Sequence, residues 1–316
     1  MDNNFETYYP PKPPLVRKKR DGHISKTIFS MVLFAVTFSI LINDYVLIGL
    51  LLLVLLLHEI GHFAMMKLFG YEDLKMTFIP FLGAMVQGEK KQYSQKETII
   101  MLMAGPLPGI IIGLLLINYS LDNEIAWLVQ LSVLLLFLNI VNLLPLDPLD
   151  GGQLVKNLFL GNHELFQLIF AIASSLFVIA LGWWFDSWFI MIFGFLMGFR
   201  VKQLHKLFLI RKDLKNNNIS FESSYESLSD RSYAKIKKVV MEYTPVLKTI
   251  EEESESDHFD KIVANQVDSI LLQPSVKDAS LIFKLMTLLI WIGAFFMTTY
   301  VFLNIDFQQL IHAFQN

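Results

Sequence analysis

Long, nearly uninterrupted apolar runs recur along this chain and decide what it can fold into. A helix needs about 20 mostly apolar residues to cross the ~30 Å hydrocarbon core of a bilayer. Apolar residues make up 54% of the sequence and charged residues 17%, and Phe alone occurs 27 times, which excludes an ordinary soluble domain. Seven runs are long enough, or nearly so, to span as helices: approximately 27–43, 46–69, 98–117, 125–144, 165–182, 187–200 and 281–304. The sequence therefore predicts an all-α polytopic membrane protein with about seven transmembrane helices.

The distribution of lysine and arginine predicts how these spans are oriented, because basic residues are retained on the cytoplasmic side. With the N-terminus inside, four cytoplasmic segments hold 25 of the 26 basic residues, and the last one, Lys284, lies at the start of the final span. These segments are 1–26, 67–97, 145–164 and 200–280. We therefore expect a multi-pass protein with a cytoplasmic N-terminus. The absence of cysteine excludes disulfides and thiolate metal sites, and it is compatible with the bacterial inner membrane that we expect as the compartment.

The remaining segments define the domain organisation. Residues 1–26 are polar and rich in proline, which predicts a disordered cytoplasmic tail ahead of a membrane domain at 27–200. Residues 70–97 are too apolar for a plain loop and too often interrupted for a helix, so we expect a re-entrant β-hairpin after the second span. Residues 201–280 predict a small helical cytoplasmic region, which either binds a regulator or is a solvated linker. A final span and a short tail follow at 281–316.

Three ionisable side chains lie in the second span, in the order His58, Glu59 and His62. Residues four apart lie on the same face of a helix, so both imidazoles can reach one metal ion. Glu59 follows the first imidazole directly, where it can act as general base toward a water molecule at the metal. Each ionisable group inside a membrane helix costs roughly 2.5 kcal/mol or more. The simpler alternative is a pair of histidines that bond across helices or hold a structural ion, but that role has no need of Glu59.

A catalytic zinc needs a third protein ligand and one open position. The fourth span ends in a loop that carries Asp147 and Asp150 between the helix breakers Pro145 and Gly151. The predicted topology places this loop on the same side of the membrane as the end of the span that follows His62. Chemistry alone leaves both aspartates as candidate ligands, and a loop with two solvated aspartates is the alternative.

The two motifs together resemble the site-2 protease family of intramembrane zinc metalloproteases. His58-Glu59-Ile60-Gly61-His62 lies in one span, and Asn142-x-x-Pro145-x-x-x-Leu149-Asp150-Gly151 closes a later one. The resemblance covers about residues 46–153, which would form the catalytic core. It implies that His58, His62 and Asp150 are the metal ligands, to the exclusion of Asp147. It also implies that Asn142 helps to hold substrate or to stabilise the oxyanion.

Two further features bear on this resemblance. A Gly-Pro pair in the span between the motifs also fits, and here it is Gly105-Pro106. In many members an Asn follows three residues after that Pro; this chain has Gly109, so any role of that Asn is absent or moved. The expected hairpin matches a family feature that presents an edge strand to an unwound substrate, which implies strand docking at Phe81 and Gly83.

The resemblance implies an enzyme that cuts transmembrane protein substrates within or near the cytoplasmic half of the bilayer. Such regulated intramembrane proteolysis would use one Zn²⁺ per chain and Glu59 as the catalytic base. Two alternatives are a zinc-binding membrane transporter or sensor, in which Glu59 is dispensable, and a catalytically inactive membrane scaffold. The third and fifth spans contain few polar residues, which disfavours a transport path. The expected partners are a membrane substrate and the lipid bilayer, and no basic stripe interleaved with aromatics suggests nucleic acid.

Overall fold

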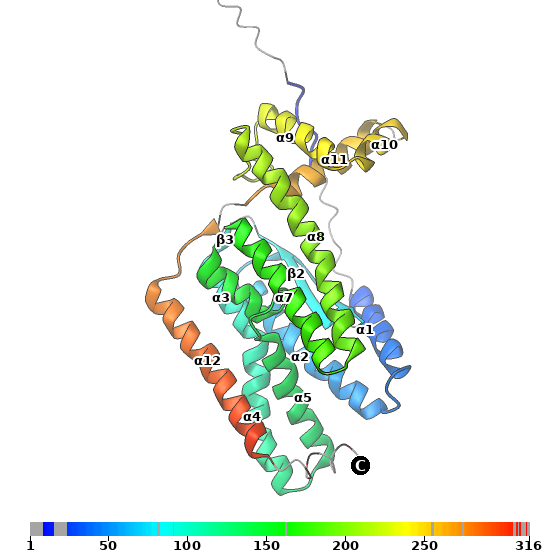
Figure 1. Cartoon of the computed structure of the whole chain (residues 1–316), viewed down its shortest axis with the longest axis vertical. Coiled ribbons are helices and arrows are strands. Elements are labelled where there is room, and N and C mark those ends of the chain that lie inside the picture. The colour runs from blue at the N-terminus through cyan, green and yellow to red at the C-terminus, as the bar shows by residue number, and fades with distance from the viewer. Residues whose placement is uncertain are drawn as a thin grey trace, which may run out of the picture. The chain divides into compact units, whose positions relative to one another are not determined.

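Two units divide the chain, and helices make up most of both (Figure 1). The computed structural model describes residues 9–15, 24–80, 83–90, 92–161, 163–253, 256–273 and 275–305, with three single residues beyond. The membrane unit lies within residues 20–197 and 276–316, and the helical unit lies within residues 1–19 and 198–275. Helix α8 runs from one unit into the other.

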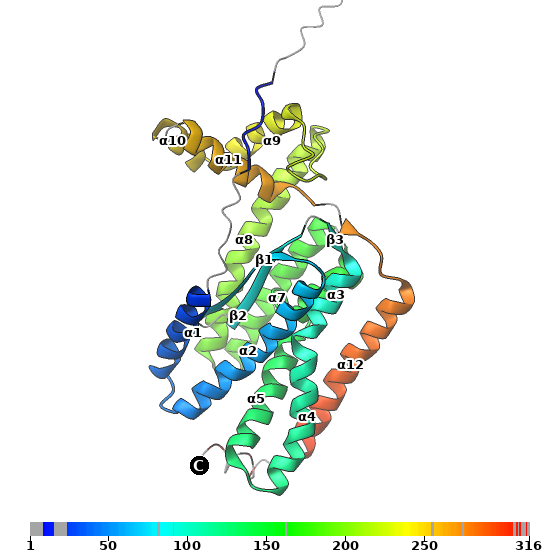
Figure 2. The ribbon, with the colours of Figure 1, turned by 180° about the vertical axis from the view of Figure 1, so that it is seen from behind.

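The membrane unit is a bundle of apolar helices with one β-hairpin (Figure 2). Helix α4 packs along α5, and α2 packs against α3, α4 and α5. The elements of this unit are α1 (Ile24–Ser39), α2 (Tyr45–Leu68), β1 (Glu72–Ile79), β2 (Gly83–Glu89), β3 (Tyr93–Ser94), α3 (Gln95–Ala104), α4 (Pro106–Asp122), α5 (Ala126–Asn142), α6 (Asp150–Val155), the π-helical turn η1 (Lys156–Leu160), α7 (Glu164–Trp184), the first part of α8 (Trp188–Asn216) and α12 (Leu281–Asn304).

Every predicted span coincides with a helix, but the helices differ in their ability to cross a membrane. Four helical segments are long and apolar enough: α2, the continuous α3–α4 segment, α7 and α12. Helices α1 and α5 are apolar but have only 16 and 17 residues. The predicted short span at 187–200 is the beginning of α8, which has 29 residues and continues into the helical unit. The structure therefore supports four spans, and the total of seven stays a prediction.

The predicted hairpin after the second span is present. Strands β1 and β2 pair antiparallel, with Met76 opposite Val86 and Phe78 opposite Ala84. The outer edge of β1 is covered by α1, because the Thr27 hydroxyl donates to the carbonyl of Met76 (2.8 Å) and the amide of Phe78 donates to the Ser30 hydroxyl (3.1 Å). Among the described residues no strand pairs with the outer edge of β2.

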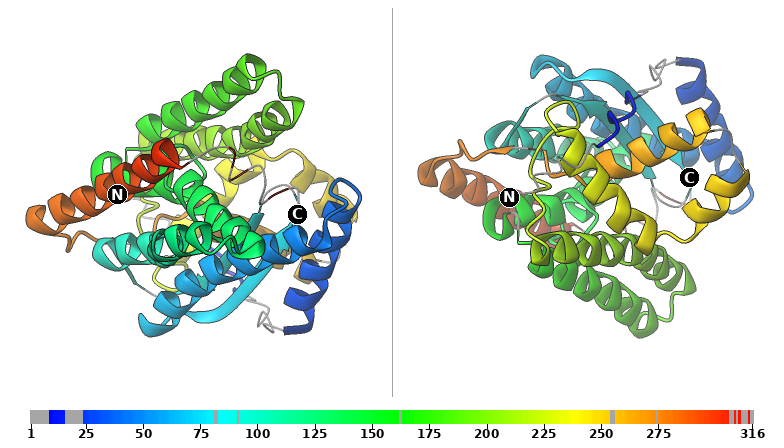
Figure 3. Two further views of the ribbon diagram at one scale, coloured as in Figure 1. Left: turned by 90° about the horizontal axis from the view of Figure 1, so that it is seen from below. Right: turned by 90° about the horizontal axis from the view of Figure 1, so that it is seen from above.

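The helical unit has an apolar core of its own. It contains the end of α8, α9 (Asp230–Tyr243), α10 (Val246–Glu253) and α11 (Ser256–Ile270), drawn in yellow and orange (Figure 3, right). The short strand β4 (Ser275–Val276) follows at the boundary between the two units. Fully buried Ile236, Val240, Val263 and Val267 lie at its centre. The packing of these amphipathic helices explains why the polar segment between the last two predicted spans forms ordered structure.

The N-terminal segment differs in part from the predicted disordered tail at 1–26. Residues 9–15 lie in extended backbone against the helical unit. The Lys12 ammonium donates to the carbonyls of Tyr225 (2.6 Å), Leu228 (2.5 Å) and Glu226 (3.0 Å), and the Tyr225 hydroxyl donates to the carbonyl of Pro13 (2.8 Å). These bonds offset the entropy cost of ordering the segment. Residues 1–8 and 16–23 lie outside the described residues, and α1 begins at Ile24.

Candidate metal centre

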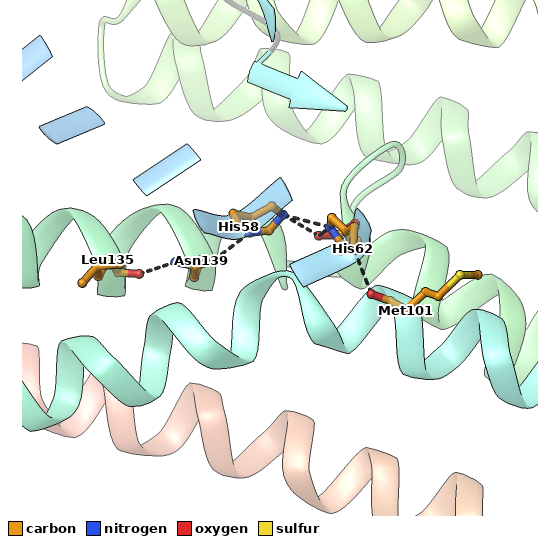
Figure 4. A network of polar contacts seen from close by, with 6 residues as sticks. His58, His62, Met101, Leu135 and Asn139 are labelled. Atoms are coloured by element: carbon orange, nitrogen blue, oxygen red, sulfur yellow. Dashed lines mark hydrogen bonds and ion pairs between the residues drawn. The ribbon is translucent and has the colours of Figure 1, made fainter. Parts of the chain in front are cut away.

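The histidine pair of α2 is directed into the membrane unit (Figure 4). The exposed fractions of His58 and His62 are 6% and 14%, and their Nε2 atoms lie 3.0 Å apart. Four-residue spacing on a regular helix brings the two rings one above the other, as the sequence predicts. Two neutral imidazoles whose Nε2 lone pairs meet would repel each other, so this arrangement favours a cation between them.

The Nδ1 atom of each imidazole ring lies within hydrogen-bonding distance of an oxygen acceptor. His58 Nδ1 lies 2.7 Å from Oδ1 of Asn139, and His62 Nδ1 lies 2.8 Å from the carbonyl oxygen of Met101 (Figure 4). The Asn139 amide nitrogen donates to the carbonyl of Leu135 (2.7 Å), which fixes its oxygen toward His58. Each Nδ1 therefore carries the proton, and each Nε2 keeps its lone pair for a metal.

Asp150, the first residue of α6, completes a triangle of ligand atoms. Its Oδ2 lies 3.1 Å from Nε2 of His58 and 3.2 Å from Nε2 of His62. Ligand atoms at about 2.0–2.1 Å from a tetrahedral zinc lie about 3.3 Å from one another, so the three atoms fit one face of such a site. These three residues could hold a metal ion, and two imidazoles with one carboxylate suit zinc with one position left open.

Asp147 is the other aspartate that the sequence offered as a ligand, and its carboxylate bonds to residues outside the triangle. Its Oδ1 accepts from Nζ of Lys156 (2.6 Å) and from the amide of Gln153 (3.0 Å), and its backbone N–H donates to the Ser174 hydroxyl (3.0 Å). The exposed fractions of Asp147 and Lys156 are only 2% and 7%. Asp147 thus forms a buried ion pair with Lys156, and Asp150 is the candidate third ligand.

Close backbone contacts hold the loop that carries these aspartates. The carbonyl of Leu143, just after α5, accepts from the indole nitrogen of Trp291 in α12 (2.9 Å). Gly151 packs against the same carbonyl so closely that a Cβ atom would lie 2.0 Å from the oxygen. Any larger residue at this position would therefore displace the loop and, with it, the Asp150 carboxylate.

Glu59 lies between the two histidines in sequence and is buried, with 4% of its surface exposed. The backbone N–H of Val86, on β2, is within hydrogen-bonding reach of its carboxylate. Its Oε2 has no partner among the described residues. A buried carboxylate oxygen without a partner is costly unless a ligand or water uses it. Glu59 is therefore positioned to act on a molecule bound at the triangle.

For the other three expected site residues, the structure shows no hydrogen bond to the triangle of ligand atoms among the described residues. Asn142 is the last residue of α5 and is half-buried, and the structure gives its side chain no hydrogen bond to the other described site residues. Gly83 begins β2 with a φ of 91°. Phe81 lies outside the described residues. Substrate roles for these three residues stay predictions.

Asn139 is the site residue that sequence reasoning did not identify. The sequence does contain a clue to its role: Asn139 is an amide inside an apolar span, where a polar side chain is costly unless it forms a hydrogen bond or serves a function. It packs against Gly109, where a Cβ would lie 2.2 Å from the Asn139 amide nitrogen. The glycine at position 109 therefore makes room for an amide from the neighbouring helix.

Replacing Asn139 by Ala should lower zinc affinity about 10- to 100-fold, because His58 loses the acceptor that fixes its tautomer. Competition with a chromophoric chelator measures this affinity on the purified chain. Asn142→Ala, three residues further along α5, is the matched control and should bind zinc as the wild type does. Gly109→Ala should reproduce part of the loss by displacing Asn139. Equal affinity in the wild type and the Asn139→Ala variant would contradict the assigned role.

Fold and site together define an integral membrane protein of helical type in which two histidines and one aspartate converge and could hold a metal ion. Residues 45–123 match the model of "Peptidase family M50", and this range includes His58, Glu59 and His62. The segment therefore forms a domain of peptidase family M50, the family of the site-2 proteases.

Two curated proteins are similar over part of the chain. Stage IV sporulation protein FB of Bacillus subtilis is 33% identical over 116 residues, which is 34% of this chain and 38% of that protein. A zinc metalloprotease of Methanocaldococcus jannaschii is 32% identical over 142 residues, which is 42% of this chain and 40% of that protein. The chain thus spans about two-fifths of the length of these relatives.

Among solved structures, the site-2 protease from Methanocaldococcus jannaschii is 25% identical, with a TM-score of 0.44. The similarity covers 55% of this chain and 87% of that chain.

Proposed function

We propose that this chain is an intramembrane zinc metalloprotease that hydrolyses peptide bonds of transmembrane protein substrates within or near the cytoplasmic half of the bilayer. The observation that carries the proposal is the triangle of His58, His62 and Asp150 with the buried carboxylate of Glu59 beside it. The M50 domain and the zinc metalloprotease relative support the same reaction class. A purely structural metal site would not need a buried base next to its ligands.

His58, His62 and Asp150 would hold one zinc ion through two Nε2 atoms and one carboxylate oxygen. Zinc, when bound, supplies Lewis-acid chemistry that polarises a peptide carbonyl and makes a water molecule acidic near neutral pH. Asn139 and the carbonyl of Met101 keep both imidazoles in the required tautomer. These residues thus form the rigid part of the site.

Glu59 is the proposed general acid–base group. Its carboxylate takes a proton from the attacking water and later passes that proton to the nitrogen of the leaving amine. The neighbouring N–H of Val86 orients one side of the carboxylate. The Asn142 amide is our proposed donor to the oxyanion that develops on the substrate carbonyl.

The outer edge of β2, which pairs with no other described strand, is the proposed docking edge for substrate. A transmembrane helix hides its carbonyls in internal hydrogen bonds, so it must unwind before it can be cut. The outer edge of β1 is covered by Thr27 and Ser30, whereas β2 runs past Glu59 at Val86. A substrate strand that pairs with β2 would replace its lost backbone bonds and pass the base. Phe81, which precedes β2 in the sequence, and Gly83, which begins it, are the residues that we propose border the docked segment.

The remaining assignments follow from the charge distribution. We infer a multi-pass protein of a bacterial inner membrane with a cytoplasmic N-terminus, since almost all basic residues fall in the segments that this topology places inside. The helical unit around residues 201–280 would then be cytoplasmic. Its packed core argues against a solvated linker, and we propose that this folded unit binds a regulator.

Cleavage by the purified chain should stop when zinc is removed and return when zinc is restored. Detergent-solubilised membrane proteins are incubated with the chain, and new N-termini are mapped by mass spectrometry, with and without the chelator 1,10-phenanthroline. We expect zinc-dependent termini that cluster within or beside the apolar spans of their proteins. Termini that are insensitive to the chelator, or confined to soluble domains, would contradict the proposed function.

A further inference from the structure

An apolar groove runs along the membrane unit between α2, the α3–α4 segment and α12, with a volume of about 630 Å³. Seventeen side chains and glycines line it, and Thr287 is the one among them with a polar side chain. Helix α12 lies alongside α4 (Figure 1), and the residues that line the groove on α12 belong to its first turns. All three walls belong to segments that are long and apolar enough to cross a membrane.

We propose that this groove binds one acyl chain of an anionic phospholipid, with the headgroup at the end where α3 and α12 begin. The proposal concerns a ligand site separate from the metal centre and does not depend on proteolysis.

The length of the groove fits a single acyl chain. The lining residues along the α3–α4 segment extend from Ile99 to Ile112. At 1.5 Å per residue this corresponds to about 20 Å. Half of the ~30 Å hydrocarbon core is about 15 Å, which is the depth that one leaflet's chains occupy. A chain anchored at the start of α3 can therefore follow the groove for its whole depth.

The charge at one end fits an anionic headgroup. The Nζ of Lys96 lies 5.5 Å from the centre of the Phe283 ring, which itself lines the groove. Lys284 follows Phe283, and Lys277 precedes α12 by four residues. The nearby carboxylate of Asp278 already accepts from the Ser94 hydroxyl and the Lys96 N–H, and these two bonds lower its pKa. Glu97, next to Lys96, is paired with Lys90. Four lysines against two engaged carboxylates leave a net positive site at this end, where lysines attract anionic lipid.

A substrate helix fits this groove less well, because the groove does not reach the reactive groups. None of the three ligands nor Glu59 is among the residues that line it. Helix α2 separates the two regions: Ile60, Gly61 and Ala64 face the groove, whereas Glu59 faces Val86 of the hairpin. A peptide segment in the groove would therefore be separated from the Glu59 carboxylate by helix α2.

Lipid retention by the full-length chain tests the proposal. The chain is purified in detergent, incubated with phosphatidylglycerol or phosphatidylcholine, and analysed by native mass spectrometry. We expect one tightly retained phosphatidylglycerol per chain and weaker retention of phosphatidylcholine. Ala64→Trp fills the groove from a position whose side chain is exposed. It should reduce retention at least about ten-fold, since every methylene group excluded from the groove loses its favourable burial. Leu115→Trp, on an exposed part of α4 outside the groove, is the matched control and should retain lipid normally.

The headgroup preference is tested separately. Lys96→Ala should reduce the preference for phosphatidylglycerol over phosphatidylcholine about five-fold, whereas Lys26→Ala on α1 should leave it unchanged. Absence of retained lipid in the wild type, or equal retention in the Ala64→Trp and Leu115→Trp variants, would overturn the proposal. So would photo-crosslinking from position 64 to a peptide substrate instead of to lipid.

Discussion

A Glu59→Gln chain should bind zinc as the wild type does and lose at least about 10²–10⁴-fold of its peptidase turnover, which is the range that a positioned general base supplies. Glutamine has the shape of glutamate and keeps an oxygen for the N–H of Val86. It cannot take a proton from water. The two Nε2 atoms and the Asp150 carboxylate stay in place, so the metal centre should survive the substitution.

Two measurements on the same preparations separate chemistry from binding. Metal content by elemental mass spectrometry should give about one zinc per chain in both proteins, and cleavage of a membrane substrate should be seen only with Glu59. Glu124→Gln, in the exposed connection between α4 and α5, makes the same chemical change away from the site and should be fully active. Because the inactive chain still binds its substrate, it should also retain substrates that the wild type releases.

The result also discriminates between classes of protein. A transporter or sensor needs the ligands but not a base, so full function in the Glu59→Gln chain would favour that class. A catalytically inactive scaffold would show no turnover in the wild type either. Loss of turnover with zinc retained is expected of a hydrolase alone among these three.

The membrane spans and the histidine pair were predictable from sequence because their signals are local. The expected second span at 46–69 corresponds to α2 at Tyr45–Leu68, since an apolar run and a helix that buries its backbone in lipid have the same length. His58 and His62 needed only helical periodicity to be placed together. The short helices α1 and α5 show the limit of this argument, because an apolar run does not say whether its helix is long enough to span.

The contacts that support the site depend on tertiary packing and were not predictable. Helix α5 contains several polar residues, and only its packing against α2 and α4 selects Asn139 as the partner of His58. The sequence offered Asp147 and Asp150 as equals, and resemblance to a family was needed to choose between them. In the structure the difference is that Lys156, nine residues after Asp147, neutralises that carboxylate. The ordered segment at 9–15 likewise depends on carbonyls near Tyr225, more than 200 residues away.

Asp150→Ala should abolish zinc binding at stoichiometric concentration, whereas Asp147→Ala should keep zinc and lose stability. Loss of an outer partner of a metal ligand typically costs 10- to 100-fold in affinity, so loss of one of three direct ligands should cost more than about 100-fold. Asp147 contributes differently. Its removal leaves Lys156 buried without its carboxylate, and breaking such a pair costs about 3–5 kcal/mol.

The Asp150 substitution should therefore change the zinc content, and the Asp147 substitution should change the unfolding temperature. Both are measured on detergent-purified chains, with unfolding followed in the presence of a chelator so that metal binding does not add to stability. The Asp150→Ala chain should unfold at the temperature of the metal-free wild type and contain almost no zinc. The Asp147→Ala chain should contain about one zinc when loaded below its melting temperature, and it should unfold at a lower temperature.

A compensating substitution distinguishes a lost charge partner from a general defect at position 147. Lys156→Met combined with Asp147→Asn removes both charges, and replacing a buried pair by uncharged residues of similar size is often neutral. The double variant should therefore be more stable than Asp147→Ala and should bind zinc. If the double variant is as unstable as Asp147→Ala, the ion pair is not the anchor of the loop. If zinc is lost from Asp147→Ala but kept by Asp150→Ala, the two carboxylates have exchanged the roles that their contacts indicate.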